Sequence, residues 1–164
     1  MKIRLSAKKL GFSIIEVVVA ISIIFVGLIG IMTLSTQNSQ IQGGNKTVLI
    51  ASMLAQEGIE LVRSRRDNNW LESLAWDNNL SGSFTVNYSN HNPVPTASID
   101  DARLYINASG FYDYDNSGTP TPFYRLISIA NQTAYSMDVR CRVKWNEKGD
   151  TKEYVAQTLL YDWK

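Results

Sequence analysis

The residues best suited to chemistry lie near the N-terminus, in segment 11–16. Glu16 places a carboxylate at the start of an apolar run that reaches Leu34. An isolated carboxylate in lipid costs roughly 3 kcal/mol or more, so an acid inside such a run is by default a functional residue. Four cations precede the run: Lys2, Arg4, Lys8 and Lys9. The pattern predicts a basic leader, a membrane helix, and a carboxylate that pairs with a cation at low dielectric constant.

This order of parts resembles the class III signal of type IV prepilins and pseudopilins. The parts are a basic leader, Gly11, Phe12, and an acid in the first helical turn, Glu16. The resemblance implies that a prepilin peptidase cuts after Gly11 and methylates the new N-terminal residue, Phe12. It also implies that Glu16 acts in assembly, by pairing with the free amine of Phe12 in a neighbouring subunit. The partners implied are other pilin subunits, the peptidase and the inner-membrane assembly platform.

Ordinary membrane signals explain the segment less well. A secretory signal peptide is cut after its apolar run at small residues, and segment 32–35 is a poor match to such a site. A plain signal anchor needs about 20 apolar residues, which the run supplies, but it gives no reason for Glu16. Two alternatives stay open. One is a pseudopilin of a type II secretion or DNA-uptake system, and the other is a signal-anchored surface binding protein that never polymerises.

Composition and charge suggest one membrane segment and one soluble domain within the 164 residues. With the resemblance, they imply three parts: a cleaved leader over 1–11, a transmembrane and assembly helix over 12–34, and a globular pilin domain over 35–164. The leader holds four of the 16 Lys and Arg residues and no acid, so the processed chain carries a net charge of −3. No basic stripe for nucleic acid remains. The leader cations predict a single pass through the inner membrane with the C-terminal domain outside the cytoplasm, and the resemblance implies a later place in a pilus or pseudopilus.

Hydrophobic spacing in the globular part predicts an α+β fold, and the resemblance implies that this fold is pilin-like. An amphipathic helix is expected over about 46–66, with Val48, Ala51, Met53 or Leu54, Ala55, Gly58, Leu61 and Val62 facing a sheet. Gly43 and Gly44 predict an interruption before this helix, and Asp67-Asn68-Asn69 its end. Alternation then predicts an antiparallel sheet over about 83–160. Its expected strands are 83–88, 103–107, 123–130, 134–145 and 153–160, with a loop over 89–101.

Several of these segments are similar to those of PilV-type minor pilins, which are akin to the minor pseudopilin I of type II secretion systems. The similar segments are the helix around 55–63, the strand over 122–129, the strand that carries Cys141 and Trp145, and the closing residues 160–163. This resemblance implies a minor subunit of a type IV pilus rather than its main one.

The remaining polar residues do not assemble into an enzyme. His91 is the only histidine and lies in a loop, and Cys141, the only cysteine, reads as a buried residue on a strand. Asp100 and Asp101 adjoin on a turn and point apart. The sequence therefore predicts a protein that is not an enzyme and that has no catalytic residue, no cofactor and no metal site.

Two features could bind ligands but have simpler explanations. Segment 113–118 supplies side-chain oxygens followed by Gly118, like the front half of a calcium loop, but its twelfth position is Tyr124 instead of a glutamate. A plain turn is favoured over a calcium site. The tryptophans could form a carbohydrate platform, but Trp145 is expected in the core, and Trp70 and Trp76 over the seam between helix and sheet.

Overall fold

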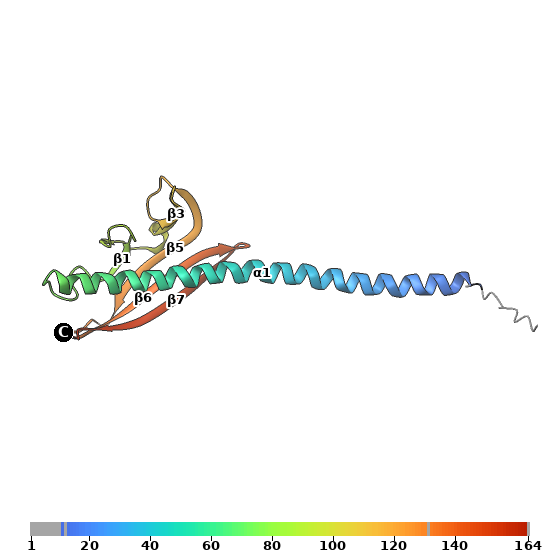
Figure 1. The fold of residues 1–164 in the computed structure, drawn as a ribbon, viewed down its shortest axis with the longest axis horizontal. Coiled ribbons are helices and arrows are strands. Elements are labelled where there is room, and N and C mark those ends of the chain that lie inside the picture. The colour runs from blue at the N-terminus through green and yellow to red at the C-terminus, as the bar shows by residue number, and fades with distance from the viewer. Residues whose placement is uncertain (1–10, 12, 131, 164) are drawn as a thin grey trace, which may run out of the picture. The chain divides into compact units, whose positions relative to one another are not determined.

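One long helix and one antiparallel sheet make up the structure. The computed structural model describes residues 11, 13–130 and 132–163. Helix α1 spans Ile14–Leu71, and the chain divides into two compact units at Gly43 and Gly44, so α1 contributes to both. In the second unit, α1 lies along the long strands of the sheet (Figure 1). The fold is thus α+β, as the sequence predicts.

The expected break at Gly43 and Gly44 is wrong, because α1 runs through both residues. Two glycines cost a helix about 2 kcal/mol relative to alanine. Breaking the helix would leave backbone groups of both halves unpaired and would require a second nucleation, which is also unfavourable.

The expected end of the helix at 67–69 is also wrong, because α1 continues to Leu71. Asn69 is fully buried, and its Nδ2 donates to the carbonyl oxygens of Trp76 and Asn78 at 3.1 and 2.9 Å. These tertiary hydrogen bonds hold the last helical turn against the loop, and they override the low helix propensity of asparagine.

The sheet has seven strands in two arms that meet at β5. One path runs β2-β1-β5-β3-β4, and β6 joins the other side of β5 and pairs in turn with β7. All pairings are antiparallel. The strands are β1 (Ser83–Val86), β2 (Pro93–Pro95), β3 (Arg103–Ile106), β4 (Tyr112–Asp113), β5 (Thr119–Ala130), β6 (Ser136–Glu147) and β7 (Asp150–Tyr161), and a short 3-10 helix, η1, spans Ile99–Asp101.

The five predicted strands are present with shifted ends, and two short strands were missed. The expected loop over 89–101 contains β2 and η1, and β4 lies between two turns. The strand expected from Ala134 begins at Ser136, and Tyr135 is exposed rather than on the apolar face. The Oγ1 of Thr133 accepts from the backbone N–H groups of Tyr135 and Ser136, so a turn occupies these positions.

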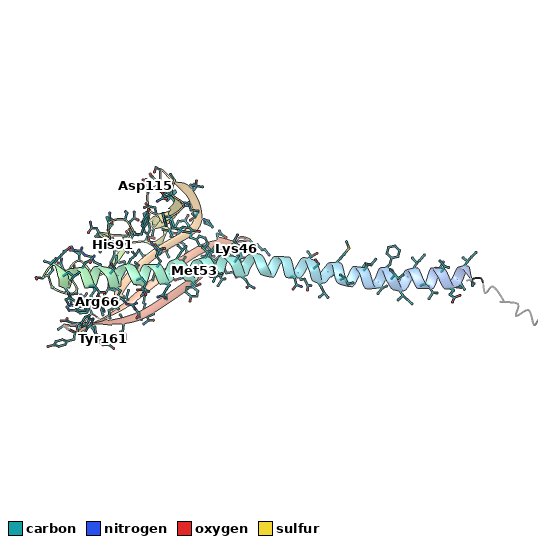
Figure 2. The ribbon with its side chains drawn as sticks, viewed as in Figure 1. Lys46, Met53, Arg66, His91, Asp115 and Tyr161 are labelled. Carbon is teal, nitrogen blue, oxygen red and sulfur yellow. The ribbon has the colours of Figure 1, made fainter. Side chains whose placement is uncertain are left out.

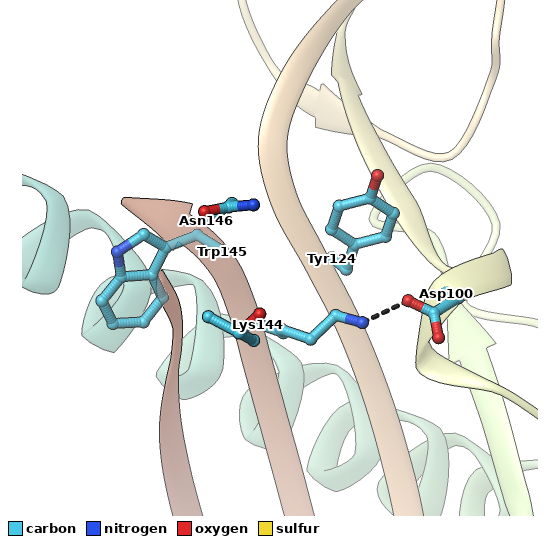
Figure 3. A pocket seen from close by; sticks show the side chains of 6 residues that line it. Asp100, Tyr124, Lys144, Trp145 and Asn146 are labelled. Carbon is cyan, nitrogen blue, oxygen red and sulfur yellow. Dashed lines mark hydrogen bonds and ion pairs between the residues drawn. The ribbon is translucent and has the colours of Figure 1, made fainter. Parts of the chain in front are cut away.

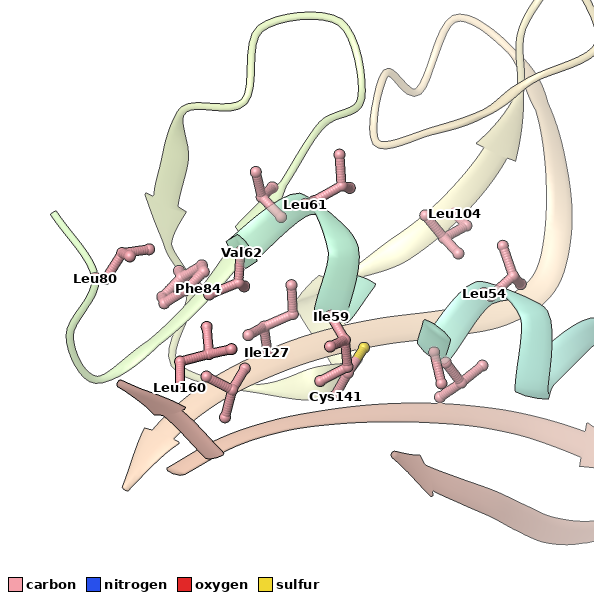
Figure 4. Packing of buried hydrophobic residues seen from close by; sticks show 14 of the residues in the cluster. Leu54, Ile59, Leu61, Val62, Leu80, Phe84, Leu104, Ile127, Cys141 and Leu160 are labelled. Atoms are coloured by element: carbon pink, nitrogen blue, oxygen red, sulfur yellow. The ribbon is translucent and has the colours of Figure 1, made fainter. Parts of the chain in front are cut away.

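The core lies between α1 and the sheet (Figure 4). Met137, Val139, Cys141, Val143 and Trp145 are buried on one face of β6, as alternation predicts. The helix adds Ala51, Leu54, Ala55, Ile59, Leu61 and Val62, and the other strands add Phe84, Val86, Leu104, Phe123, Ile127 and Leu160. Burying each large apolar side chain contributes about 1.5–3 kcal/mol.

The predicted apolar helix face is correct except at its start. Val48 is exposed and lies one turn before Ala51, the first buried residue among the helix residues whose side chains the structure describes. Of the pair Met53 and Leu54, Leu54 is the buried one.

Figure 2 shows Lys46 and Met53 on the helix, His91 and Asp115 on loops, and Arg66 and Tyr161 toward the other end of the domain.

Candidate functional site

The first candidate site is the beginning of α1. The most apolar 18-residue window of this helix has a mean hydropathy of 2.9 and is not buried within the protein. The helix is therefore long and apolar enough to cross a membrane. Gly11 is exposed. Phe12 and residues 1–10, which include the predicted methylation site and leader cations, lie outside the described residues.

Glu16 lies in the first turn of this helix. The carbonyl oxygen of Ser13 accepts from the backbone N–H groups of Glu16 and Val17, at 3.0 and 3.2 Å, and so begins the helix. A carboxylate in the first turn interacts favourably with the helix dipole, by about 0.3–1 kcal/mol at an exposed site. Among the described residues, no cation forms an ion pair with Glu16. The dipole offsets only part of the cost of placing this charge in lipid.

The second candidate site is a buried charge between helix and sheet. Arg125 on β5 is 1% exposed, and its guanidinium lies 3.2 Å from the carboxylate of Glu57 on α1. It also donates to the carbonyl oxygens of Leu54 and Val86, at 3.2 and 3.4 Å. Its Nε donates to the hydroxyl of Tyr114 at 3.0 Å, and that hydroxyl donates to the Arg125 carbonyl at 2.9 Å. One side chain thus joins α1, β1, β5 and the loop after β4.

The charges of this junction affect one another. Burial of the Arg125 guanidinium by itself lowers its pKa, but the Tyr114 phenol and the Glu57 carboxylate outweigh that effect, so the pKa of Arg125 lies above its ordinary value. Burial raises the pKa of Tyr114. Burial also raises the pKa of the Cys141 thiol to about 12. Near neutral pH the arginine is charged, while the Tyr114 phenol and the Cys141 thiol keep their protons, so Cys141 is not a thiolate nucleophile.

Next to this junction the helix approaches β6 very closely. A Cβ on Gly58 would lie 2.5 Å from the Sγ of Cys141 and 3.5 Å from the Cδ of Arg125. Only glycine allows this approach, because real Cβ atoms do not come so near a sulfur atom. Cys141 is fully buried, as the sequence predicts, and it acts as a packing residue.

The loop that resembles half of a calcium site is held by its own hydrogen bonds. The Asp113 carboxylate accepts from the side-chain amide of Asn87 and from the backbone N–H groups of Tyr114 and Asp115. The Asp115 carboxylate accepts from the backbone N–H of Ser117 at 3.0 Å, and this bond lowers the pKa of Asp115. The Asp113 and Asp115 carboxylates thus accept N–H groups of the turn, and Asp113 accepts one more from Asn87, which follows β1. Among the described residues, no group of three or more His, Cys, Asp or Glu side chains could hold a metal ion.

The other polar candidates lie apart from one another. His91 is in the β1–β2 loop, and its φ of 52° places it in a left-handed turn. Asp100 of η1 forms an ion pair with Lys144 of β6 at the side of a hollow of about 240 Å³ (Figure 3). The Lys144 ammonium also lies 5.3 Å from the centre of the Tyr124 ring. This ion pair ties η1 to the sheet.

The tryptophans do not form one platform. Trp145 is buried in the core, as predicted. Trp76, which is predicted to lie over the seam between helix and sheet, is also buried. Trp70 stacks beneath the Arg66 guanidinium, 4.8 Å from the ring centre, and meets Trp163 edge-on at 4.6 Å. Trp163 is exposed. Trp76 and Trp145 thus belong to the core, whereas Trp70 and Trp163 form an edge-on pair.

The Arg125 junction is the feature that sequence analysis missed. The signal was one arginine among the mostly apolar residues 123–129, opposite a helix whose Glu57 has no favourable partner on the helix itself. The predicted pair of Glu60 and Arg63 is present at 2.7 Å. The pairing of Glu57 required the tertiary structure, because 68 residues separate it from Arg125.

Together, the fold and the sites define an α+β protein that has, in the part of the chain that the structure describes, one apolar helix of membrane-spanning length. No family model, curated protein or solved structure matches this chain.

Proposed function

We propose that this protein is a minor subunit of a type IV pilus. The observation that carries the proposal is Glu16, an acid in the first turn of a helix whose apolar side chains are all exposed from Ile14 to Leu34. So large an apolar surface requires lipid or other apolar helices around it. An acid within that surface is stabilised by a cationic partner, and none of the described cations forms an ion pair with Glu16.

The proposed assembly step uses the segment around Gly11. Cleavage after Gly11 gives Phe12 a free amine, and Glu16 of a neighbouring subunit offers the matching carboxylate. Pairing of the two charges at low dielectric constant offsets the desolvation cost of each. The contact is heterologous, so repetition builds a helical fibre rather than a closed dimer. Since lipid and helix bundle are both apolar, helix packing drives the transfer between them.

This proposal gives the protein a place and a set of partners. Before assembly it is a single-pass inner-membrane protein with its C-terminal domain outside the cytoplasm, as Lys2, Arg4, Lys8 and Lys9 favour. It then joins a pilus or pseudopilus. Its partners are other pilin subunits, the prepilin peptidase and the assembly platform, and it is not an enzyme. A pseudopilin of a secretion or DNA-uptake system uses the same N-terminal chemistry and is the second candidate.

Two measurements test the proposal in a bacterium with a type IV pilus system. Mass spectrometry of the purified protein should find residues 1–11 absent and one methyl group on Phe12. Glu16→Ala should still insert and be cut, but it should be absent from sheared fibres, since it lacks the charge that pairs with the neighbouring amine. An intact Met1 on a protein that never enters fibres would instead identify the signal-anchored surface protein.

Two variants serve as controls. Ser22→Ala removes a polar group from the same helix and leaves the charge of the helix unchanged. The Ser22 hydroxyl donates to the Val18 carbonyl, 2.8 Å away on the same helix. This variant should enter fibres normally. Gly11→Glu should leave the leader uncut. Normal incorporation of Glu16→Ala would refute the assembly role of Glu16, and cleavage of Gly11→Glu after residue 11 would refute the site.

A further inference from the structure

The sequence contains several tripeptides of the form Asn-X-Ser/Thr in which X is not proline. Such an acceptor tripeptide is the signal for N-linked glycosylation in secreted proteins, where it belongs to surface loops. The asparagines of these tripeptides are Asn45, Asn79, Asn87, Asn107 and Asn131. Asn131 lies outside the described residues. The structure distinguishes the other four, because a sugar can be attached only to an amide nitrogen that is free and faces solvent.

Two of these asparagines use their amide groups within the fold. The Asn87 amide nitrogen donates to the Asp113 carboxylate. The Asn107 amide nitrogen donates to the Tyr88 hydroxyl at 2.9 Å, and its amide oxygen accepts from two backbone N–H groups of the turn that follows, both at 3.0 Å. Asn87 and Asn107 are both partly buried. A sugar on either nitrogen would displace contacts that hold these loops together.

Asn45 is exposed, but it lies within helix α1. The signal consists of the asparagine amide and the hydroxyl two residues further on, here that of Thr47. On a helix, residues two positions apart do not face each other. The helix therefore separates the two parts of this signal, and Asn45 is a poor acceptor.

Asn79 lies on a tight turn between α1 and β1. The Leu80 N–H donates to the Asp77 carbonyl at 2.9 Å, and the φ of Asn79 is 61°, a conformation that asparagine adopts more readily than most residues. Leu80 is fully buried, and the Asn69 amide donates to the Asn78 carbonyl at 2.9 Å. The turn is thus fixed on its inner side, while Asn79 is exposed.

Both parts of the acceptor signal on this turn are accessible. Ser81 is exposed, as is Asn79. Among the described residues, the side chains of Asn79 and Ser81 take part in no hydrogen bond or ion pair. Asp77, two residues before Asn79, also adds a carboxylate that the acceptor tripeptides of Asn45, Asn87 and Asn107 lack at that position. This acceptor therefore has a charged group beside the tripeptide that a transferase can recognise.

We propose that Asn79 carries an N-linked glycan, transferred from a polyprenyl-pyrophosphate-linked oligosaccharide. The amide nitrogen of Asn79 attacks C1 of the first sugar. A C–N bond forms, the bond from C1 to the pyrophosphate oxygen breaks, and its electron pair leaves with the lipid pyrophosphate. The amide loses one proton to a base of the transferase, and no group is oxidised or reduced. The exposed turn accommodates the glycan without loss of a contact in the fold.

The inference rests on one part of the proposed function, the location of the domain outside the cytoplasm, because N-linked acceptors belong to secreted segments. Mass spectrometry of the protein, purified from the cells that naturally make it, tests both proposals in one tryptic digest. The peptide 67–103, released by cuts after Arg66 and Arg103, should carry an added oligosaccharide mass, and fragmentation should place that mass on Asn79.

The N-terminal peptide of the same digest reports leader cleavage, so the two proposals fail separately. An unmodified peptide 67–103 would overturn the glycan whether or not Phe12 is methylated. A glycan on Asn79 of a protein that keeps Met1 would support the glycan and contradict the assembly function.

Three variants made in the same cells identify the acceptor. Asn79→Asp removes the amide nitrogen but keeps a side chain that suits the left-handed turn, and it should lose the whole added mass. Ser81→Ala retains Asn79 and should also lose the mass, because the hydroxyl completes the signal. Asn45→Gln is the matched control, an exposed asparagine of the same tripeptide type, and it should keep the mass. Retention of the mass by Ser81→Ala, or its loss in Asn45→Gln, would overturn Asn79 as the site.

Discussion

The guanidinium of Arg125 on β5 lies 3.2 Å from the carboxylate of Glu57 on α1, although the arginine side chain is only 1% exposed and the glutamate 37%. A buried cation is tolerated where a counter-charge and hydrogen-bond acceptors surround it. Arg125 has both, because two carbonyl oxygens and the Tyr114 hydroxyl complete its contacts. This pair therefore sets the position of the helix on the sheet.

Replacing Arg125 by methionine should destabilise the domain by about 3 kcal/mol, since it leaves two buried carbonyl groups and the Tyr114 hydroxyl without this partner. Glu57→Gln should cost less, about 1 kcal/mol, because solvent already screens the half-exposed carboxylate and an amide oxygen still accepts from the guanidinium. Denaturant unfolding of the purified protein measures both changes. Glu60→Gln is the matched control on the same helix and should change stability by less than about 0.5 kcal/mol. Equal losses for Glu57→Gln and Glu60→Gln would contradict the role of the buried pair.

Adding one methyl group at Gly58 should destabilise the contact between α1 and β6. In Gly58→Ala the new Cβ would lie 2.5 Å from the Cys141 sulfur, so helix or strand must move. Overpacking of this kind costs about 1–3 kcal/mol. The double variant Gly58→Ala, Cys141→Ala should recover most of the stability that Gly58→Ala loses. The midpoint of thermal unfolding measures the stability of each variant.

Gly43→Ala is the control for helix propensity. A Cβ there meets nothing within 4 Å, so this change should raise helix stability, by about 1 kcal/mol. If Gly58→Ala were also stabilising, propensity rather than the close approach would govern that position.

The buried thiol should make stability fall at high pH. The pKa of Cys141 is about 12 in the folded protein, above its ordinary value near 9. The folded state therefore holds this proton more tightly, and its stabilising contribution is full below about pH 9 and is lost as the pH rises toward 12. Because burial also raises the pKa of Tyr114, that group acts in the same direction. Stability measured against pH should decline less steeply in Cys141→Ala than in the wild type.

Alkylation provides an independent check on the same thiol. At pH 8, iodoacetamide should leave native Cys141 unmodified and should modify it after unfolding, as mass spectrometry can show. Rapid modification of the folded protein would mean that the thiol is reached by solvent.

The turn around Asp115 should behave as a turn and not as a calcium site. The Ser117 N–H lowers the pKa of the Asp115 carboxyl. In Ser117→Pro, which lacks that donor, this pKa should return toward its ordinary value. A carboxyl NMR titration measures this change. Calcium at about 1 mM, where weak extracellular sites fill, should leave the Asp113 and Asp115 signals unmoved. Saturable shifts of both signals would show that the cation displaces the turn hydrogen bonds.

Much of the fold could be predicted from local pattern. Alternation from Met137 to Trp145 gave the buried face of β6, and helical spacing gave Ala51, Ala55 and Val62 as core residues, because both periodicities follow from backbone geometry. Several errors lie where contacts outside the element itself decide. Asn69 extends α1 through hydrogen bonds to the loop after it, and the short strands β2 and β4 form only because β1 and β3 are there to pair with them.

The amino-acid sequence by itself determined the apolar helix, the acid at its start and the alternating strands, since each depends only on residues close together in the chain. Only the tertiary structure decided that Glu57 neutralises a buried arginine and that Gly58 meets the sulfur of Cys141. These relationships join residues far apart in sequence, and their energies depend on burial, which no local pattern contains.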